Sequence, residues 1–133
     1  MSVFGLSPFL RRALLADALI SGATGLLMLI GANVLASILG LPEALLRYAG
    51  LVLLPYGSLV AYVATREQLR RWAVWAVIIA NAIWAVDSII LLLSGWLTPN
   101  ALGYAFIIFQ ALVVAAFAEI QYIGLRRSMT TVA

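Results

Sequence analysis

The chain has 133 residues, of which 65% are hydrophobic and only 10% are charged. A soluble domain is close to half apolar and about a quarter charged, so this composition excludes an ordinary soluble domain and predicts membrane spans. The net charge of +3 comes from eight arginines and five acidic residues. Because the arginines stand at the ends of apolar stretches, we expect them to anchor the protein in a lipid bilayer and not to bind nucleic acid.

Several kinds of chemistry are excluded because the residues that they need are absent. The sequence contains no cysteine, histidine or lysine. It therefore offers no thiol, no imidazole base or ligand, and no amine for a Schiff base. We expect no metal site and no cofactor. The sequence also has no nucleophile-elbow motif and no phosphate-loop motif, and we therefore expect that the protein is not an enzyme.

Four apolar stretches follow one another along the chain, at about residues 8–30, 42–65, 72–93 and 99–123. Each has the ~20 residues that a helix needs to cross ~30 Å of hydrocarbon. Their apolar runs are unbroken, which excludes the alternation of a membrane β-barrel. Residues 33–39 are too few and too apolar for an ordinary loop, so we expect a short interfacial segment there. The predicted fold is all-α, an integral membrane four-helix bundle forming one transmembrane domain over residues 1–133.

The ends of these stretches carry residues typical of helix termini. A Ser or Thr directly before Pro is typical of a helix N-cap, and an acidic residue is favourable in the first turn of a helix. A Gly is typical of the position where a helix ends. The residues in these positions are Ser7-Pro8, Thr98-Pro99, Pro42-Glu43, Gly31 and Gly40.

A weak internal repeat links the second and fourth stretches. The second opens on Pro42-Glu43-Ala44-Leu45 and the fourth on Pro99-Asn100-Ala101-Leu102. Two helical hairpins of the same orientation would give this pattern. The alternative is that the two segments are similar by chance, because the sequence is of low complexity.

Arginine placement predicts the orientation in the membrane. Seven of the eight arginines fall on one side of the four spans, and Arg47 alone falls on the other. The positive-inside rule then places both termini in the cytoplasm. We expect a multi-pass protein of the bacterial inner membrane.

Three of the four spans carry a carboxylate, and ionisable groups are expensive in hydrocarbon and commonly functional. At 100° per residue, Asp17 shares one stripe of the first span with Ser21 and Thr24. Glu119 and Tyr122 share a stripe of the fourth span, at a depth similar to that of Asp17. These five residues form the predicted ligand or proton site. The alternative is that each acid pairs with a nearby arginine at the interface.

Asp87 lies in the opposite half of the membrane, where Arg47 begins the second span. A long arginine side chain can reach inward along a bundle. We therefore expect an Arg47–Asp87 ion pair. It would be a structural pair that fixes helix register, or a gate or anion-binding position.

Two resemblances follow from these features. The chain is similar in layout to the small multidrug-resistance transporters, with four spans, a short chain and a carboxylate in the first helix; that resemblance implies Asp17 as a drug or proton site. At Ser21-Gly22 and Leu39-Gly40-Leu41-Pro42 it resembles the DoxX-like group of small bacterial membrane proteins. This second resemblance implies a four-helix bundle without a settled chemistry.

Two classes of function fit this sequence. The first is binding or transport of a small lipophilic or cationic molecule in an intramembrane cavity. The alternative is a non-catalytic structural or accessory subunit of a membrane complex. Gln110 faces away from Glu119 on the fourth span, which suggests a contact with a second copy of the chain in a homo-oligomer; a position on a wide interface is the alternative.

Overall fold

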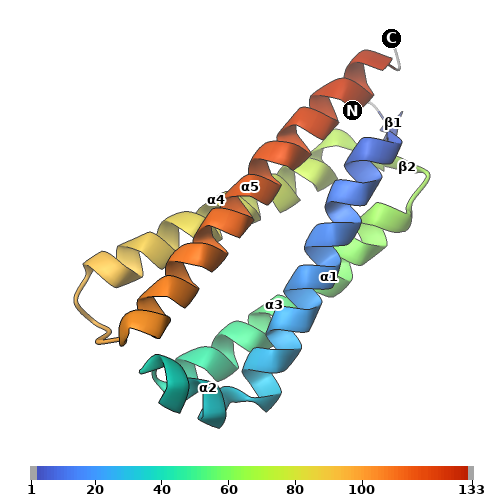
Figure 1. Cartoon of the computed structure of the whole chain (residues 1–133). Helices are drawn as coiled ribbons and strands as arrows, with labels where there is room; N and C mark the ends of the chain where they lie inside the picture. The colour runs from blue at the N-terminus through green and yellow to red at the C-terminus, as the bar shows by residue number, and fades with distance from the viewer. Residues whose placement is uncertain (1–2, 132–133) are drawn as a thin grey trace.

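A computed structural model describes residues 3–131 of the chain, with side chains as far as Ser128. The described part is an all-helical bundle with one very small sheet (Figure 1). The elements in chain order are β1 (Val3–Gly5), α1 (Pro8–Ile30), α2 (Ala32–Leu39), α3 (Glu43–Thr65), β2 (Gln68–Arg70), α4 (Arg71–Leu93) and α5 (Ala101–Thr131).

Four of the helices, α1, α3, α4 and α5, are long and apolar enough to cross a membrane. Large apolar side chains on their outer faces are exposed, for example Leu19, Ile83 and Phe109. Such a surface suits a lipid solvent. The prediction of an all-α membrane bundle is therefore confirmed.

The long helices form two hairpins, α1 with α3 and α4 with α5, which lie side by side (Figure 1). Glycine allows the helix backbones of the first hairpin to approach closely. A Cβ atom added at Gly50 would lie 2.7 Å from the Gly25 carbonyl oxygen, and one added at Gly57 would lie 3.1 Å from the Gly22 nitrogen. No larger residue fits at Gly50 unless the two backbones separate.

Each hairpin begins with a three-residue strand, and the two strands join the hairpins at one end of the bundle. β1 pairs antiparallel with β2, with Val3 opposite Arg70 and Gly5 opposite Gln68. The described parts of both chain ends lie at this same end, here named the sheet end (Figure 1). The sequence analysis did not predict these strands.

The opposite end, named the α2 end, is tied together by Asn100. Its side-chain amide donates to the Ile38 carbonyl at 2.7 Å, and its backbone N–H donates to the Leu39 carbonyl at 3.2 Å. Gly103 packs directly against that Leu39 carbonyl oxygen. These contacts fasten α2 to the start of α5.

Most predicted helix termini agree with the structure. Ser7 caps α1 by accepting a hydrogen bond from the Leu10 N–H at 3.1 Å. Gly31 and Gly40 end α1 and α2, and Gly40 adopts the left-handed conformation with φ 68°. Residues 33–39 lie in the helix α2, and their predicted place at the membrane interface stays a prediction.

The predicted bounds of the fourth span were wrong at both ends. Thr98 does not cap α5: Asn100 does, because its side-chain oxygen accepts from the Gly103 N–H at 2.9 Å. The helix also continues beyond residue 123 to Thr131. Its last turns pack on the first hairpin, where Ser128 Oγ donates to Ser7 Oγ at 2.9 Å.

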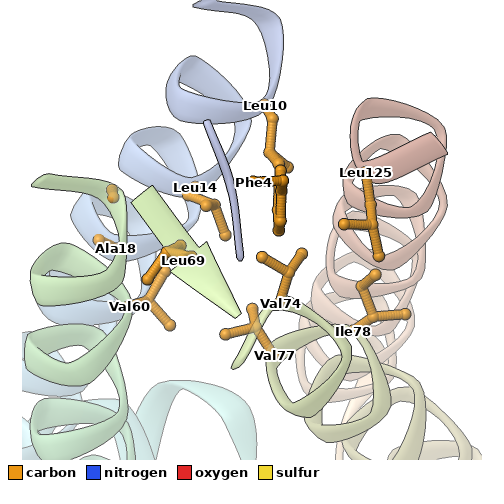
Figure 2. Close-up of a cluster of buried hydrophobic side chains, with 11 residues drawn as sticks. Phe4, Leu10, Leu14, Ala18, Val60, Leu69, Val74, Val77, Ile78 and Leu125 are labelled. Carbon is orange, nitrogen blue, oxygen red and sulfur yellow. The ribbon is translucent and has the colours of Figure 1, made fainter. Parts of the chain in front are cut away.

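The space between the hairpins at the sheet end is filled by apolar side chains. Figure 2 shows side chains from both strands and all four long helices converging there. This sheet-end cluster consists of Phe4, Leu10, Leu14, Ala18, Val60, Ala64, Leu69, Val74, Val77, Ile78 and Leu125. A second apolar cluster, around Met28, Leu46 and Ile107, lies toward the α2 end.

Candidate functional site: a buried carboxyl network below an open cavity

A buried polar network lies next to the sheet-end cluster, and Asp17 is its centre. Asp17 is only 1% exposed. Its Oδ2 atom lies 2.8 Å from Asn81 Nδ2, 2.8 Å from Gln121 Nε2 and 3.0 Å from Tyr56 Oη. Its Oδ1 atom accepts from Ser21 Oγ at 2.9 Å. One carboxyl group thus joins all four long helices.

The other members of the network also bond to each other. Asn81 Nδ2 donates to Gln121 Oε1 at 3.0 Å, and Tyr56 Oη donates to Asn81 Oδ1 at 2.9 Å. Among the described residues, no buried side-chain nitrogen or oxygen atom lacks a hydrogen-bond partner. Satisfied networks of this kind fix one arrangement of helices, because any other arrangement would leave buried polar atoms unpaired.

The helical period explains how these residues meet. Ser21 lies one turn beyond Asp17 on α1, so the two side chains stack on one face. On α5, Gln121 lies eleven residues, about three turns, after Gln110, so both glutamines share one face. That face runs along α4, where Gln121 meets Asn81 and Gln110 meets Ser88 and Trp84.

The network also follows the two-hairpin arrangement of the chain. Asn81 follows Asp17 by 64 residues, and Gln121 follows Tyr56 by 65. Asp17 and Asn81 lie on α1 and α4, the first helices of the two hairpins. Tyr56 and Gln121 lie on α3 and α5, the second helices. The four side chains therefore meet where equivalent faces of the two hairpins come together.

Asp17 forms no ion pair with any residue that the structure describes. Arg12, the nearest arginine in sequence, is exposed, and its neighbour Arg11 directs its guanidinium to the carbonyl oxygens of Ala64 and Arg66 at the end of α3. It therefore caps a helix C-terminus and does not neutralise the carboxyl group.

A large cavity of about 240 Å³ lies between the hairpins on the α2 side of the network. All four long helices contribute to its walls, which are mostly apolar. Its polar edge is formed by Thr24, Asp87, Ser88 and Gln110, with Trp84 beside them. Trp84 Nε1 donates to Gln110 Oε1 at 2.8 Å, and Gln110 Nε2 donates to Ser88 Oγ at 2.9 Å, so these side chains are held in place.

A small cavity of about 110 Å³ separates the large cavity from the network. Its polar wall consists of Ser21, Tyr56 and Asn81, three members of the network. Leu53 and Trp84 line both cavities. Asp87 and Leu91 in turn line both the large cavity and a surface groove beside Trp96. The groove, the large cavity and the small cavity therefore follow one another between the α2-end surface and the network, with these shared side chains as the walls between them.

The structure divides the predicted ligand or proton site. Asp17 and Ser21 lie together in the network, and Thr24 lines the large cavity one turn further on. Glu119 and Tyr122 are exposed on α5. Gln121 occupies the inward position of that segment, and Glu119, two residues earlier, is about 200° around the helix from it.

Tyr122 instead contributes to an aromatic group near the sheet end. Its ring lies 5.6 Å from that of Trp75, and the Arg126 guanidinium lies 5.8 Å from its centre. This position suits an interfacial aromatic residue. It does not bring Tyr122 to Asp17.

The predicted partners Arg47 and Asp87 are not paired in the structure. Arg47 Nη2 lies 3.0 Å from Glu43 Oε1, one turn earlier on the same helix. A carboxylate four residues away is the easiest partner for an exposed arginine. Asp87 is on the other hairpin, across the large cavity, and it has no ion-pair partner among the described residues.

Sequence reasoning did not identify Tyr56, Asn81 and Gln121 as the partners of Asp17. The signal for Gln121 was its eleven-residue spacing from Gln110, which puts two amides on one face of a span. Gln110 itself bonds within the chain, to α4. The structure therefore gives it an internal role that the prediction of a contact with a second copy did not include.

Comparison with known proteins gives no match: no family model, no curated protein and no solved structure matches this chain. The resemblances to DoxX-like proteins and to small multidrug-resistance transporters therefore stay predictions.

Proposed function

We propose that this protein binds a small lipophilic cation in the large cavity, as a binding or transport module of the bacterial inner membrane. The observation that carries this proposal is the composition of the cavity wall. Apolar side chains from all four long helices surround one unpaired carboxyl group, that of Asp87. Concave apolar sites with a few placed polar groups are typical ligand sites.

The electrostatics of the cavity favour a cation over an anion. Among the described residues that line the cavity, Asp87 is the only charged one, and Arg47 is paired with Glu43. Trp84, held by Gln110, adds an aromatic ring to the wall, and aromatic rings attract cations. The volume of about 240 Å³ suits a molecule smaller than most drugs.

The arginine distribution supports a cytoplasmic sheet end. In the fold, the start of α1, the segment around β2 and the end of α5 all lie there, and together they carry seven of the eight arginines. Under the positive-inside rule, the cavity mouth at the α2 end then faces away from the cytoplasm.

The test uses two ligands of one shape. Benzyltrimethylammonium and its uncharged carbon analogue, neopentylbenzene, differ in charge alone, and their binding to the purified protein in lipid nanodiscs is measured. We expect the cation to bind about fivefold more tightly, equivalent to about 1 kcal/mol for a partly exposed carboxylate. Asp87→Asn should remove this preference, whereas Glu119→Gln, an exposed acid outside the cavity, should keep it. Equal binding of both ligands to the unaltered protein would overturn the proposal.

A second candidate function is that of a non-catalytic accessory subunit. The observation that favours it is the complete pairing of buried polar atoms, because the described bundle needs no ligand to satisfy them. This function predicts purification with a defined membrane partner. It also predicts that Asp87→Asn leaves that association unchanged.

A further inference from the structure

Three oxygen atoms in the centre of the bundle make two close contacts with only one evident hydrogen. Tyr56 Oη lies 3.0 Å from Asp17 Oδ2 and 2.9 Å from Asn81 Oδ1. A tyrosine hydroxyl carries one hydrogen, and a carboxylate and an amide oxygen carry none. If Asp17 were ionised, one of the two contacts would hold no hydrogen and would set two lone pairs against each other.

Turning the Asn81 amide over does not remove this difficulty. The Nδ2 atom donates to Asp17 Oδ2 at 2.8 Å and to Gln121 Oε1 at 3.0 Å. The reversed amide would place its oxygen against both of these oxygen atoms. Asn81 Oδ1 is therefore the atom that faces Tyr56, and it can only accept.

We propose that Asp17 is a proton-carrying site that exchanges its proton through the small cavity. The carboxyl hydrogen on Oδ2 is donated to Tyr56 Oη, and the Tyr56 hydrogen is donated to Asn81 Oδ1. Every contact in the network then holds one hydrogen. This inference goes beyond the proposed function and does not rest on it.

Among the described residues, no cationic side chain forms an ion pair with Asp17. α3 contributes Tyr56, α4 contributes the Asn81 amide and α5 contributes the Gln121 amide, and none of these carries a positive charge. On α1 itself, Arg11 is committed to the carbonyl oxygens at the end of α3. An ionised carboxyl group without a cation is expensive to bury.

The cavities define the route of exchange. The small cavity has about 110 Å³ and Ser21, Tyr56 and Asn81 in its wall, so it has room and partners for roughly three water molecules. On release, the Tyr56 hydroxyl, which lines the cavity, turns its hydrogen from Asn81 to such a water and passes it on as a proton. Tyr56 Oη takes the Asp17 proton in exchange, and the electron pair of the broken bond stays on the Asp17 carboxylate. On the other side of the network lie the packed apolar side chains of the sheet-end cluster (Figure 2).

Infrared spectroscopy of the protein in lipid at neutral pH tests the proton itself. We expect the C=O band of a protonated carboxyl group, lost in Asp17→Asn and retained in Asp87→Asn. Tyr56→Phe should move the band to higher frequency, because the carboxyl hydrogen loses its acceptor. This second variant assigns the band even if Asp17→Asn does not fold. Absence of the band from the folded protein, or a band that neither change affects, would overturn the proposal.

The rate at which the same band shifts in D2O tests the route. Ala80 lines the small cavity, whereas Ala82 on the same helix is exposed and does not. Ala80→Leu, or Ala80→Val if the larger residue prevents folding, should slow exchange at least about tenfold, and Ala82→Leu should leave it unchanged. The band itself reports that the network is intact. An unchanged rate in the Ala80 variant would show that the proton does not pass through this cavity.

Discussion

The sheet half and the α2 half of this bundle differ in what fills the space between the two hairpins. At the sheet end the space is filled by packed apolar side chains and by the network around Asp17. Toward the α2 end it holds a cavity beside the second apolar cluster, and Asn100 bonds the start of α5 to α2. The same four helices thus form a solid half and a hollow half.

The two intramembrane acids show the same contrast. Asp17 is buried and has hydrogen-bond partners on all four long helices, whereas Asp87 is exposed at a cavity wall. Burial with full hydrogen bonding suits a group that fixes structure and holds a proton. Exposure without a paired cation suits a group that meets an incoming ligand. The depth of a carboxylate in a span therefore says less about its role than the space next to it.

The largest expected change in stability is a loss on replacing Gln121, compared with Gln110 on the same face of α5. Gln121→Leu should lower the free energy of unfolding by about 3 kcal/mol, because it leaves buried donors and acceptors of Asp17 and Asn81 unpaired. Gln110→Leu should cost less than about 1 kcal/mol, because water in the large cavity can replace the lost bonds. Thermal unfolding in detergent compares the two. Equal losses would contradict the distinction between a solid and a hollow half.

A smaller effect is expected where the first hairpin packs backbone against backbone. Gly50→Ala should destabilise the protein by about 1–2 kcal/mol, because the added carbon would lie 2.7 Å from the Gly25 carbonyl oxygen. Gly22→Ala is the matched control, since an added carbon there meets nothing within 4 Å. Unfolding in detergent should separate the two variants, and an unaltered Gly50→Ala protein would show that the hairpin can spread at no cost.

The smallest effects should come from the two helix caps that fasten the ends of the bundle. Ser7→Ala removes the cap of α1 at the sheet end, and Asn100→Ala removes the cap of α5 at the α2 end. Each should cost about 1 kcal/mol. Asn100→Ala should in addition increase hydrogen exchange in α2, because Asn100 also holds the Ile38 carbonyl. If the α2 amides exchange equally slowly in Asn100→Ala and in the unaltered protein, Asn100 does not hold α2 in place.

Sequence reasoning predicted the helices well because the length of an apolar run fixes a membrane span. Ser7, Gly31 and Gly40 marked helix ends correctly, since capping depends on neighbours within one turn. It also placed Asp17 and Ser21 on one stripe, because both lie on the same helix. Interactions within a helix could thus be predicted from spacing alone.

Interactions between helices could not be predicted in this way. The period of one helix shows which residues share a stripe, but not which stripe of another helix it meets. For this reason Glu119 was expected near Asp17, where the structure places Gln121. The ion pair of Arg47 was likewise assigned across the bundle, although Glu43 lay one turn away. The short strands escaped notice because three-residue segments carry too little pattern.

The most direct test of the account is to measure charge-selective binding in two matched variants. Benzyltrimethylammonium and neopentylbenzene are titrated into the unaltered protein, Asp87→Asn and Asp17→Asn, all in nanodiscs. The account predicts that the roughly fivefold preference for the cation disappears in Asp87→Asn and persists in Asp17→Asn, because the Asp17 carboxyl group is already neutral. Loss of the preference in Asp17→Asn, with Asp87→Asn unaffected, would contradict it.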